Sequence, residues 1–337
     1  MALNITDTAY AGAFASYFWL PATFGLDTIQ KGAVHVEDGI KKKHTIGRID
    51  FATPLQPRQD EPTANSAFTV DGRSLVPQDL MVYSRFNPRD FESHWLAEEL
   101  SPTLLARELP VTAENYMMQI GLNRAFEQIE TGIWMGSTTY TADPGSAGNG
   151  QIVFFDGFIK KMVNDATVLK VASPLPLTAA ASDGSTVYNI VDAMNALLQL
   201  CATNKKALLA NSKRYERMKF IVSINTEQIY HTFLTTSQTF KGVNTTEQGI
   251  NKFKGYIVEP LAGMPDNTIL FVSATDGVDS NMYVGINSTE DNDLQLARWR
   301  PDSESFFLKG LMKFDTQYGF SEEAFLFTTL TAATFTA

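Results

Sequence analysis

The residue types that most often carry out catalysis or bind metals are few in this chain, and they do not gather into a recognisable site. The four histidines are far apart, and none stands three or four positions from another, as two ligands on one helical turn would. Cys201 falls on the apolar side of an expected helix, which favours a buried, unreactive thiol over a nucleophile. The G-x-S-x-G, H-E-x-x-H and kinase signatures are absent. We therefore expect no enzymatic activity, no cofactor and no metal site.

Two stretches remain as candidates for binding phosphate groups, and neither fits well. The glycine-rich residues 143–151 lack both the Gly-Lys-Ser/Thr ending of a P-loop and the strand-to-helix setting of a dinucleotide fold, so a plain turn is favoured. The lysine run 41–43 is too short for a nucleic-acid surface. The net charge of −10 also argues against general nucleic-acid binding, because phosphate contacts need clustered Lys and Arg.

Composition indicates a folded protein of ordinary type, with 44% hydrophobic and 19% charged residues among 337. A single cysteine excludes an intrachain disulfide and favours a reducing compartment. The apolar residues 9–24 lack a basic leader and are interrupted by Pro21, so a signal peptide is not expected. No run reaches the ~18–20 apolar residues of a membrane span. We expect a soluble chain without a membrane partner.

The longest predicted element is an amphipathic helix over residues 112–136. Its apolar positions recur with a helical period, and the polar residues Gln119, Asn123, Glu127 and Glu130 fall on the opposite face. At ~1.5 Å per residue the helix is ~35 Å long. A helix of that length suits a spine along which other parts of the chain are arranged. The apolar positions are Met118, Leu122, Ala125, Phe126, Ile129 and Ile133.

Two segments before the helix have no obvious way to be stable alone. The first is an N-terminal arm, residues 1–43, whose aromatic residues must be covered by the chain's own core or by a neighbouring copy. The second is residues 44–84, which predict a two-stranded ribbon with a proline-rich tip. A two-stranded ribbon is marginal in water. We interpret this ribbon as an arm that contacts a neighbouring subunit. The alternative is a flexible surface hairpin.

The chain after residue 185 predicts a second lobe. A Pro, Ala and Ser-rich connector at 168–184 ends in an Asp-Gly turn. Helical and alternating patterns follow each other through residues 186–285, and long strands with one apolar face, including Leu308, Met312 and Phe314, close the chain. Alternation of this kind implies an antiparallel sheet with one covered side. The predicted fold class is α+β.

Taken together, this order of elements resembles the major capsid proteins of tailed bacteriophages, which have the Hong Kong-type capsid fold. The resemblance covers essentially the whole chain and rests on architecture and on three runs: LVPQDLMVYSRFNPRDF, ENYMMQIGLNRAFEQIETGIWMGS and GNGQIVFFDGF. It implies five parts. These are an N-terminal arm (1–43), an extended β-hairpin loop (44–84), a peripheral domain (85–185) with the spine helix 112–136, an axial domain (186–285), and return strands of the peripheral domain (286–337).

The resemblance also implies what the protein does. Members of this family form hexamers and pentamers that close an icosahedral shell around double-stranded DNA, with a portal, scaffolding and in some cases decoration proteins as partners. They form the virion capsid and assemble in the cytoplasm of the bacterial host. In the family the extended loop lies over an adjacent subunit. Because the aromatic arm begins almost at Met1, we expect any scaffolding to be a separate protein. The absence of lysine between Lys43 and Lys160 removes the covalent crosslink that some relatives form, so we expect a noncovalent shell.

Candidate interface residues follow from the segments that need a partner. An encapsulin, a nanocompartment shell of the same fold that holds enzymes, is the nearest alternative function. A two-domain enzyme with a cleft near residues 168–184 is the alternative from another class. The interface candidates are the arm residues Phe14, Tyr17, Phe18 and Trp19, the ribbon-tip residues Arg58, Asp60 and Glu61, and the helix residues Arg124 and Glu127.

Overall fold

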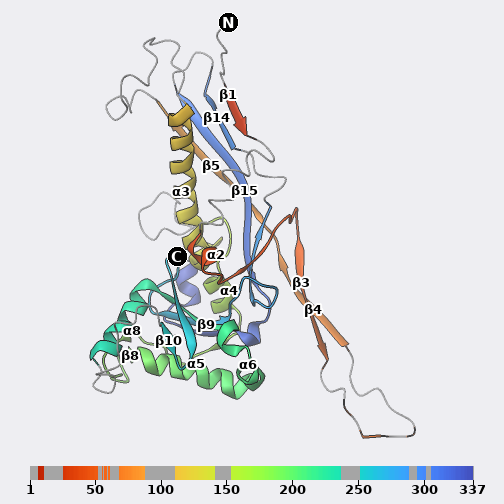
Figure 1. Cartoon of the computed structure of the whole chain (residues 1–337), viewed down its shortest axis with the longest axis vertical. Helices are drawn as coiled ribbons and strands as arrows, with labels where there is room; N and C mark the ends of the chain where they lie inside the picture. The colour runs from red at the N-terminus through yellow and green to blue at the C-terminus, as the bar shows by residue number, and fades with distance from the viewer. Residues whose placement is uncertain are drawn as a thin grey trace.

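A computed structural model of the chain describes residues 7–10, 26–51, 55, 57–58, 60, 68–87, 111–140, 153–236, 251–287, 294–300 and 305–336. The described elements form an elongated body with a long helix and a sheet at one end and an α/β lobe at the other (Figure 1). A two-stranded hairpin projects from the middle of this body and points away from both sheets (Figure 1). The aromatic residues Phe14 to Trp19 lie outside the described residues.

The first sheet is built around one long strand that alternates between a buried and a half-buried face. In this strand Phe306, Leu308, Met312 and Phe314 are buried, as the sequence predicts for the last three. All pairings in the sheet are antiparallel except that of its two strands β2 and β13, which are parallel. The strands are β1 (Asp7–Tyr10), β2 (His35–Glu37), β5 (Gln78–Phe86), β13 (Met282–Ile286), β14 (Leu294–Arg298) and β15 (Phe306–Tyr318).

The spine helix α3 spans Val111–Met135, within one residue of the predicted bounds at each end. Leu122, Phe126, Ile129 and Ile133 are buried, so the predicted apolar face is the packed one. Gly121 lets the helix approach the sheet closely, because a Cβ there would lie 2.5 Å from Cδ2 of Leu308. The helix therefore covers one face of the first sheet, and helix α4 (Phe158–Asn164) follows it in the same core.

The second sheet is covered on both faces, which differs from the one-sided sheets expected from alternation. In its central strands odd and even residues belong to two separate apolar cores. Ile221, Leu270 and Leu326 pack toward α3 and α4, whereas Phe220, Phe271 and Phe327 pack toward the helices of the second lobe. The strands are β6 (Leu169–Lys170), β9 (Met218–Ser223), β10 (Lys252–Phe253), β11 (Tyr256–Leu261), β12 (Thr268–Ser273) and β16 (Phe325–Thr328).

The remaining elements are short or belong to the second lobe. Its main helices are α5 (Ile190–Asn204), capped by the Asn189 side chain, and α8 (Ile224–Thr236). The short elements are α2 (Asp27–Gln30), β7 (Leu177–Thr178), β8 (Tyr188–Asn189), α6 (Lys206–Ala210), α7 (Arg214–Arg217), η3 (Ser321–Glu323) and η4 (Ala332–Phe335).

The hairpin is shorter than the predicted ribbon of residues 44–84. Strands β3 (His44–Phe51) and β4 (Phe68–Leu75) pair along their full length, from His44 opposite Leu75 to Phe51 opposite Phe68. The chain then breaks at Val76 and Pro77, and the following strand β5 pairs with β15 in the first sheet. Proline has no amide hydrogen to donate and tends to end a strand, which explains why the ribbon stops here.

Strand pairing also crosses the boundaries expected at residues 186–285 and 286–337. Strand β13 pairs with β15 in the first sheet, and β16 pairs with β12 and β6 in the second sheet. All four residues of β16 are buried, and a strand buried on both faces has a continuous apolar sequence rather than an alternating one. The last strand of the chain therefore stabilises the second lobe, and the return strands of the first sheet are β14 and β15.

Candidate functional site

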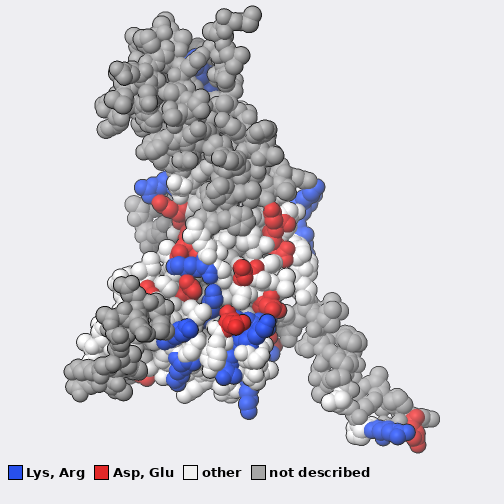
Figure 2. Space-filling model, viewed as in Figure 1, with Lys and Arg blue, Asp and Glu red and all other residues white. Residues whose placement is uncertain are grey.

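The projecting arm, here defined as β3, β4 and the residues between them, has no third strand on either side within the described part of the chain. Near its tip Leu55 is 91% exposed, and Arg58 and Asp60 are exposed as well. Neither charged residue forms an ion pair with another described residue. Basic and acidic side chains stand at the end of the arm (Figure 2). The sequence analysis placed Arg58, Asp60 and Glu61 at the tip of the ribbon. In the structure Arg58 and Asp60 lie between β3 and β4 in the chain and are exposed, and Glu61 lies outside the described residues.

The base of the arm, in contrast, is fastened to the body at four successive residues. The Arg73 guanidinium reaches the Asp165 carboxylate at 2.5 Å, and the Ser74 carbonyl accepts from the Gln317 amide at 3.1 Å. Leu75 is fully buried, and the Val76 amide donates to the Asp315 carboxylate at 2.8 Å. These contacts connect the arm to β15 and to the end of α4.

An aromatic patch lies on the face of the first sheet opposite α3. We define it as Met81, Tyr83, Trp299 and Phe307. Met81 is 59% exposed, Tyr83 45% and Trp299 40%. Tyr83 stacks on Phe307 with ring centroids 6.2 Å apart, and the Arg85 guanidinium carbon lies 5.2 Å from the Trp299 ring. Contiguous exposed aromatic surface is typical of interaction sites. The sequence analysis missed this patch, although the alternation of residues 79–85 marks the outward positions.

On the spine helix, Arg124 and Glu127 pair with each other. The Arg124 Nη1 atom lies 2.6 Å from Glu127 Oε2, and both side chains are largely exposed. An exposed pair three residues apart on a helix contributes little to stability. These two residues stay candidates for an interface only as part of the exposed helix surface.

Glu130 is buried, although the sequence places it on the polar side of the helix. The Thr28 amide donates to Glu130 Oε1 at 3.2 Å, the Thr28 hydroxyl donates to the same oxygen, and the Trp134 indole donates to that hydroxyl at 3.0 Å. Burial raises the pKa of Glu130. This cluster attaches α2, which lies within the N-terminal arm of residues 1–43, to the spine helix.

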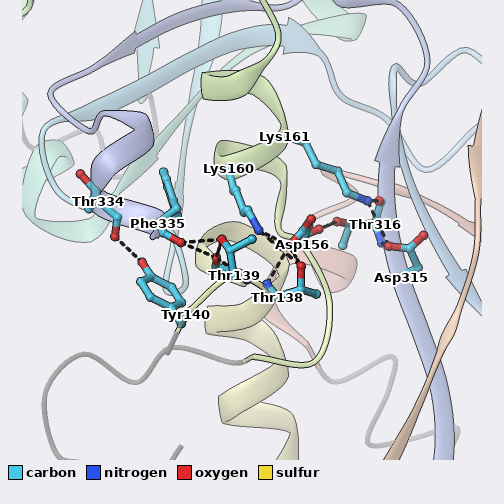
Figure 3. A network of polar contacts seen from close by, with 11 residues as sticks. Thr138, Thr139, Tyr140, Asp156, Lys160, Lys161, Asp315, Thr316, Thr334 and Phe335 are labelled. Carbon is cyan, nitrogen blue, oxygen red and sulfur yellow. Dashed lines mark hydrogen bonds and ion pairs between the residues drawn. The ribbon is translucent and has the colours of Figure 1, made fainter. Parts of the chain in front are cut away.

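A second polar network, partly buried, joins the end of α3 to α4, β15 and η4 (Figure 3). The buried Lys160 ammonium lies 2.5 Å from Asp156 Oδ1, which also accepts from the Thr138 amide and hydroxyl. Burial alone would raise the pKa of Asp156, but hydrogen bonds from Lys160 and Thr138 outweigh it and lower the pKa. The Tyr140 hydroxyl donates to the Thr334 carbonyl at 2.7 Å. Each charge is paired within the network, as expected for a structural joint.

Cys201 and the connector 168–184, which the sequence analysis considered for chemistry, belong to packed parts of the structure. Cys201 is buried, as predicted, and burial raises the pKa of its thiol to about 12, which disfavours the nucleophilic thiolate. Across the described residues, no group of three or more His, Cys, Asp or Glu is placed to hold a metal ion. The connector 168–184 contains β6 and β7, which pair with β16 and β8, so it is built into the second lobe. No helix in the described part of the chain is both long and apolar enough to span a membrane.

Solved capsid structures share this fold. The satellite phage P4 procapsid, which includes size determination (Sid) protein, aligns with a TM-score of 0.57 at 12% identity over 92% of this chain and 89% of that chain. The capsid of a native GTA particle aligns with a TM-score of 0.55 at 13% identity over 90% of each chain. The capsid of Myoviridae phage XM1 gives 0.51 at 14% identity over 90% of this chain and 92% of that chain.

No protein-family model and no curated protein matches the sequence. The likeness is therefore one of fold, and it extends over nine-tenths of the chain. The chain has the capsid-protein fold of tailed phages, and the α+β class expected from the sequence is confirmed.

Proposed function

We propose that this chain is a structural shell protein that assembles with copies of itself, as hexamers and pentamers, into an icosahedral capsid around double-stranded DNA. The shared capsid fold supports this role. The observation that carries it is the arm, whose distal part is a two-stranded ribbon with an exposed Leu55 and exposed charges. A ribbon of this kind is marginal alone and gains stability when another surface covers it.

A second copy of the chain supplies such a surface. The aromatic patch of Met81, Tyr83, Trp299 and Phe307 adds an exposed apolar face on the first sheet. We infer that the shell is held by several modest contacts per subunit, made by the arm tip with Arg58, Asp60 and Glu61 and by the aromatic residues Phe14, Tyr17, Phe18 and Trp19. Arg124 and Glu127 contribute less, because each is already paired with the other.

The acidic charge suits a container for DNA. A wall with a net charge of −10 per subunit repels the genome mildly, and salt screens the repulsion within ~8 Å under physiological conditions. The proposed partners are other copies of the chain, a portal, a separate scaffolding protein and decoration proteins. Assembly takes place in the cytoplasm of the bacterial host. The shell is noncovalent, since no lysine lies between Lys43 and Lys160 to form the lysine crosslink that some relatives make.

The test compares the full chain with a variant in which residues 52–67 are replaced by Asn-Gly, a two-residue turn that joins the paired Phe51 and Phe68. Electron microscopy of the full chain should show closed shells. The shortened variant should fold with an unchanged melting temperature and form no shells. Boiling the shells in SDS should release single chains, and a ladder of covalent multimers would refute the noncovalent shell.

The alternatives give different particles and different contents. A well-behaved monomer, with the arm folded back on its own body, would overturn the shell function. Nuclease-protected genomic DNA inside particles purified from the host supports the capsid, whereas small particles that contain enzymes and no DNA would indicate an encapsulin.

A further inference from the structure

The base of the arm contains a compact arrangement around Arg73. Its Nη2 atom lies 2.5 Å from Asp165 Oδ2, and its guanidinium carbon lies 4.3 Å from the centre of the Tyr318 ring. The Tyr318 hydroxyl donates to the same carboxylate oxygen at 2.8 Å. The arm strand β4, the end of α4 and the end of β15 therefore meet in three side chains.

Asp165 is also held by hydrogen bonds from residues outside the arm. The Thr167 amide and hydroxyl donate to Asp165 Oδ1 at 2.8 and 2.6 Å, and the oxygens of the Thr167 and Ser321 hydroxyls lie 2.7 Å apart. Burial alone would raise the pKa of Asp165, but hydrogen bonds from Thr167, Arg73 and Tyr318 outweigh it and hold the pKa well below its usual range. The carboxylate is thus charged and fixed at neutral pH.

The next residues of the arm add contacts in other directions. Leu75 fills the space left by Gly285 on β13, where a Cβ would lie 2.5 Å from Leu75 Cδ2. The Val76 amide binds Asp315 Oδ2, and the other oxygen of Asp315 lies 3.1 Å from the Lys161 ammonium. These contacts hold the base of the arm against β13 and β15.

The residue pair immediately beyond Arg73 in the ribbon consists of two glycines. Gly47 and Gly72 stand directly opposite each other, one position further out than the pair Ile46 and Arg73. A Cβ placed on Gly47 would have no atom within 4 Å, whereas one placed on Gly72 would lie 2.8 Å from the Ile46 carbonyl oxygen and 2.9 Å from Thr45 Cγ2. Gly72 therefore allows the close approach of the two strands immediately beyond the base of the arm.

We propose that Arg73, Asp165 and Tyr318 form a clamp that sets the direction in which the arm leaves the body. The arm of a free subunit then already points in the direction that contact with a second copy requires. This inference rests on the proposed shell function, in which the arm contacts a second copy. The part of β4 beyond Arg73, from Gly72 to Phe68, spans about 17 Å at ~3.3 Å per residue. A rotation of about 10° at Arg73 then moves the far end of the strand by about 3 Å, which is larger than the ~0.5 Å range of N–H···O distances.

The three residues are positioning residues, since they lie away from the arm tip. A pre-aimed arm loses less conformational freedom when it binds, and preorganisation of this kind improves affinity without new contacts. Loss of the clamp should therefore slow assembly and produce misassembled particles, even though every residue at the proposed interface is intact.

The experiment measures arm direction directly in unassembled subunits. Spin labels are attached to Leu55→Cys at the arm tip and Ala207→Cys on α6, both exposed sites, while the buried Cys201 is not expected to react. Pulsed electron spin resonance then gives the distribution of distances between the two labels. We expect Arg73→Gln to broaden this distribution at least two-fold. Arg73→Lys keeps the charge but loses the planar stacking on Tyr318, so it should give an intermediate width.

Arg217→Gln is the matched control. Arg217 lies 2.6 Å from Asp279 and is 29% exposed, close to the 31% of Arg73, but it is in the second lobe. It should leave the distribution unchanged. A lower melting temperature for Arg73→Gln with an unchanged distance distribution would show a merely structural role and would overturn the clamp. Tyr318→Phe keeps the ring under Arg73, so it gives a second reading if Arg73→Gln does not fold.

Assembly is measured separately, so that failure of the clamp and failure of the shell function are distinguishable. If the unaltered chain forms no shells, the shell function fails while the distance measurement still decides on the clamp. If Arg73→Gln broadens the distances but assembles at the normal rate into normal shells, the claim that arm direction matters for assembly is overturned.

Discussion

The central strands of the second sheet and the distal part of the arm are both β-structure, but they differ in what surrounds them. Every residue of β12 and β16 is buried, and the two faces of the sheet contribute to two cores. The arm has two strands and an end on which Leu55 is almost fully exposed. The first region is stabilised by its own chain, whereas the second, as we propose, depends on a surface from another copy. Subunit stability and shell assembly should therefore respond to different residues.

The base of the arm resembles the central strands of the second sheet in being buried by its own chain. Leu75 is as fully buried as the core strands, although it lies in the same strand as the projecting part. The division between core and arm thus falls within β4, near Gly72 and Arg73. Substitutions along this one strand offer the sharpest test of the comparison.

Phe271→Ala should have the largest effect on stability. Phe271 stacks on Phe220 with ring centroids 4.5 Å apart and packs against Tyr256 and Phe325. Removing a buried aromatic ring costs ~3–5 kcal/mol. Denaturant unfolding followed by fluorescence should show this loss in the free energy of unfolding. Leu55→Ala is the control, with a change below ~0.5 kcal/mol. Equal effects at the two sites would contradict the division.

Leu75→Ala should follow with a loss of ~2–4 kcal/mol, because it opens a cavity against Gly285 and the core beneath it. The adjacent Val76 is partly exposed, so Val76→Ala provides a control that differs by one position and should cost ~1 kcal/mol or less. The same denaturant measurement serves both. A loss under ~1 kcal/mol for Leu75→Ala would mean that the base of the arm is not part of the core.

Local patterns predicted the elements that pack through a regular period. The spine helix was found within a residue of its bounds because its apolar residues recur along one face, and β15 alternates as expected. The sheet to which β16 belongs was not predicted, since a continuous apolar run shows that a strand is buried but not which strands it joins. The ribbon was expected to continue through Pro77 to residue 84, so neither the break at Pro77 nor the pairing of β5 with β15 was predicted.

The candidate site shows the same limit. Arg58 and Asp60 were expected at an exposed tip because proline-rich polar residues between two strands predict a turn, and both residues are exposed. Glu130 was placed on the polar face because its partner Thr28 is 102 residues away, and no local pattern reports such a contact. The aromatic patch arises from residues of β5, β14 and β15 and their flanks, so it too appears only when the strands are paired.

The pH dependence of stability tests the joint between α2 and the spine helix. Burial raises the pKa of Glu130 in the folded state above its unfolded value, so the folded state binds the proton more tightly. The stabilisation is complete below the unfolded pKa and is lost as pH rises through the folded pKa. For this group, the free energy of unfolding should rise as pH falls from neutral toward the unfolded pKa. Asp27 and Lys31, the nearby charged groups, partly oppose each other.

Glu130→Gln should remove this part of the pH dependence, because an amide does not titrate and its oxygen still accepts from Thr28. The effect should be smaller than that of Leu75→Ala, and it is measured by denaturant unfolding at several pH values. Glu127→Gln, on the exposed side of the same helix, is the control and should keep the original profile. An identical profile for Glu130→Gln would show that Glu130 is not the group responsible.

Arg58→Glu should have the smallest effect on the subunit and a clear effect on the shell. Arg58 is exposed and has no ion-pair partner among the described residues, so the free energy of unfolding should change by less than ~0.5 kcal/mol. Assembly should be weakened, since reversal adds a third acid beside Asp60 and Glu61 and reverses any charge pairing with a neighbouring copy. Light scattering during assembly and particle counts by electron microscopy measure this yield. Lys42→Glu makes the same charge change at an exposed residue before the arm and should reduce the yield less. Normal assembly of Arg58→Glu would remove the tip charges from the proposed interface, and the comparison would then rest on the aromatic patch and on the direction of the arm.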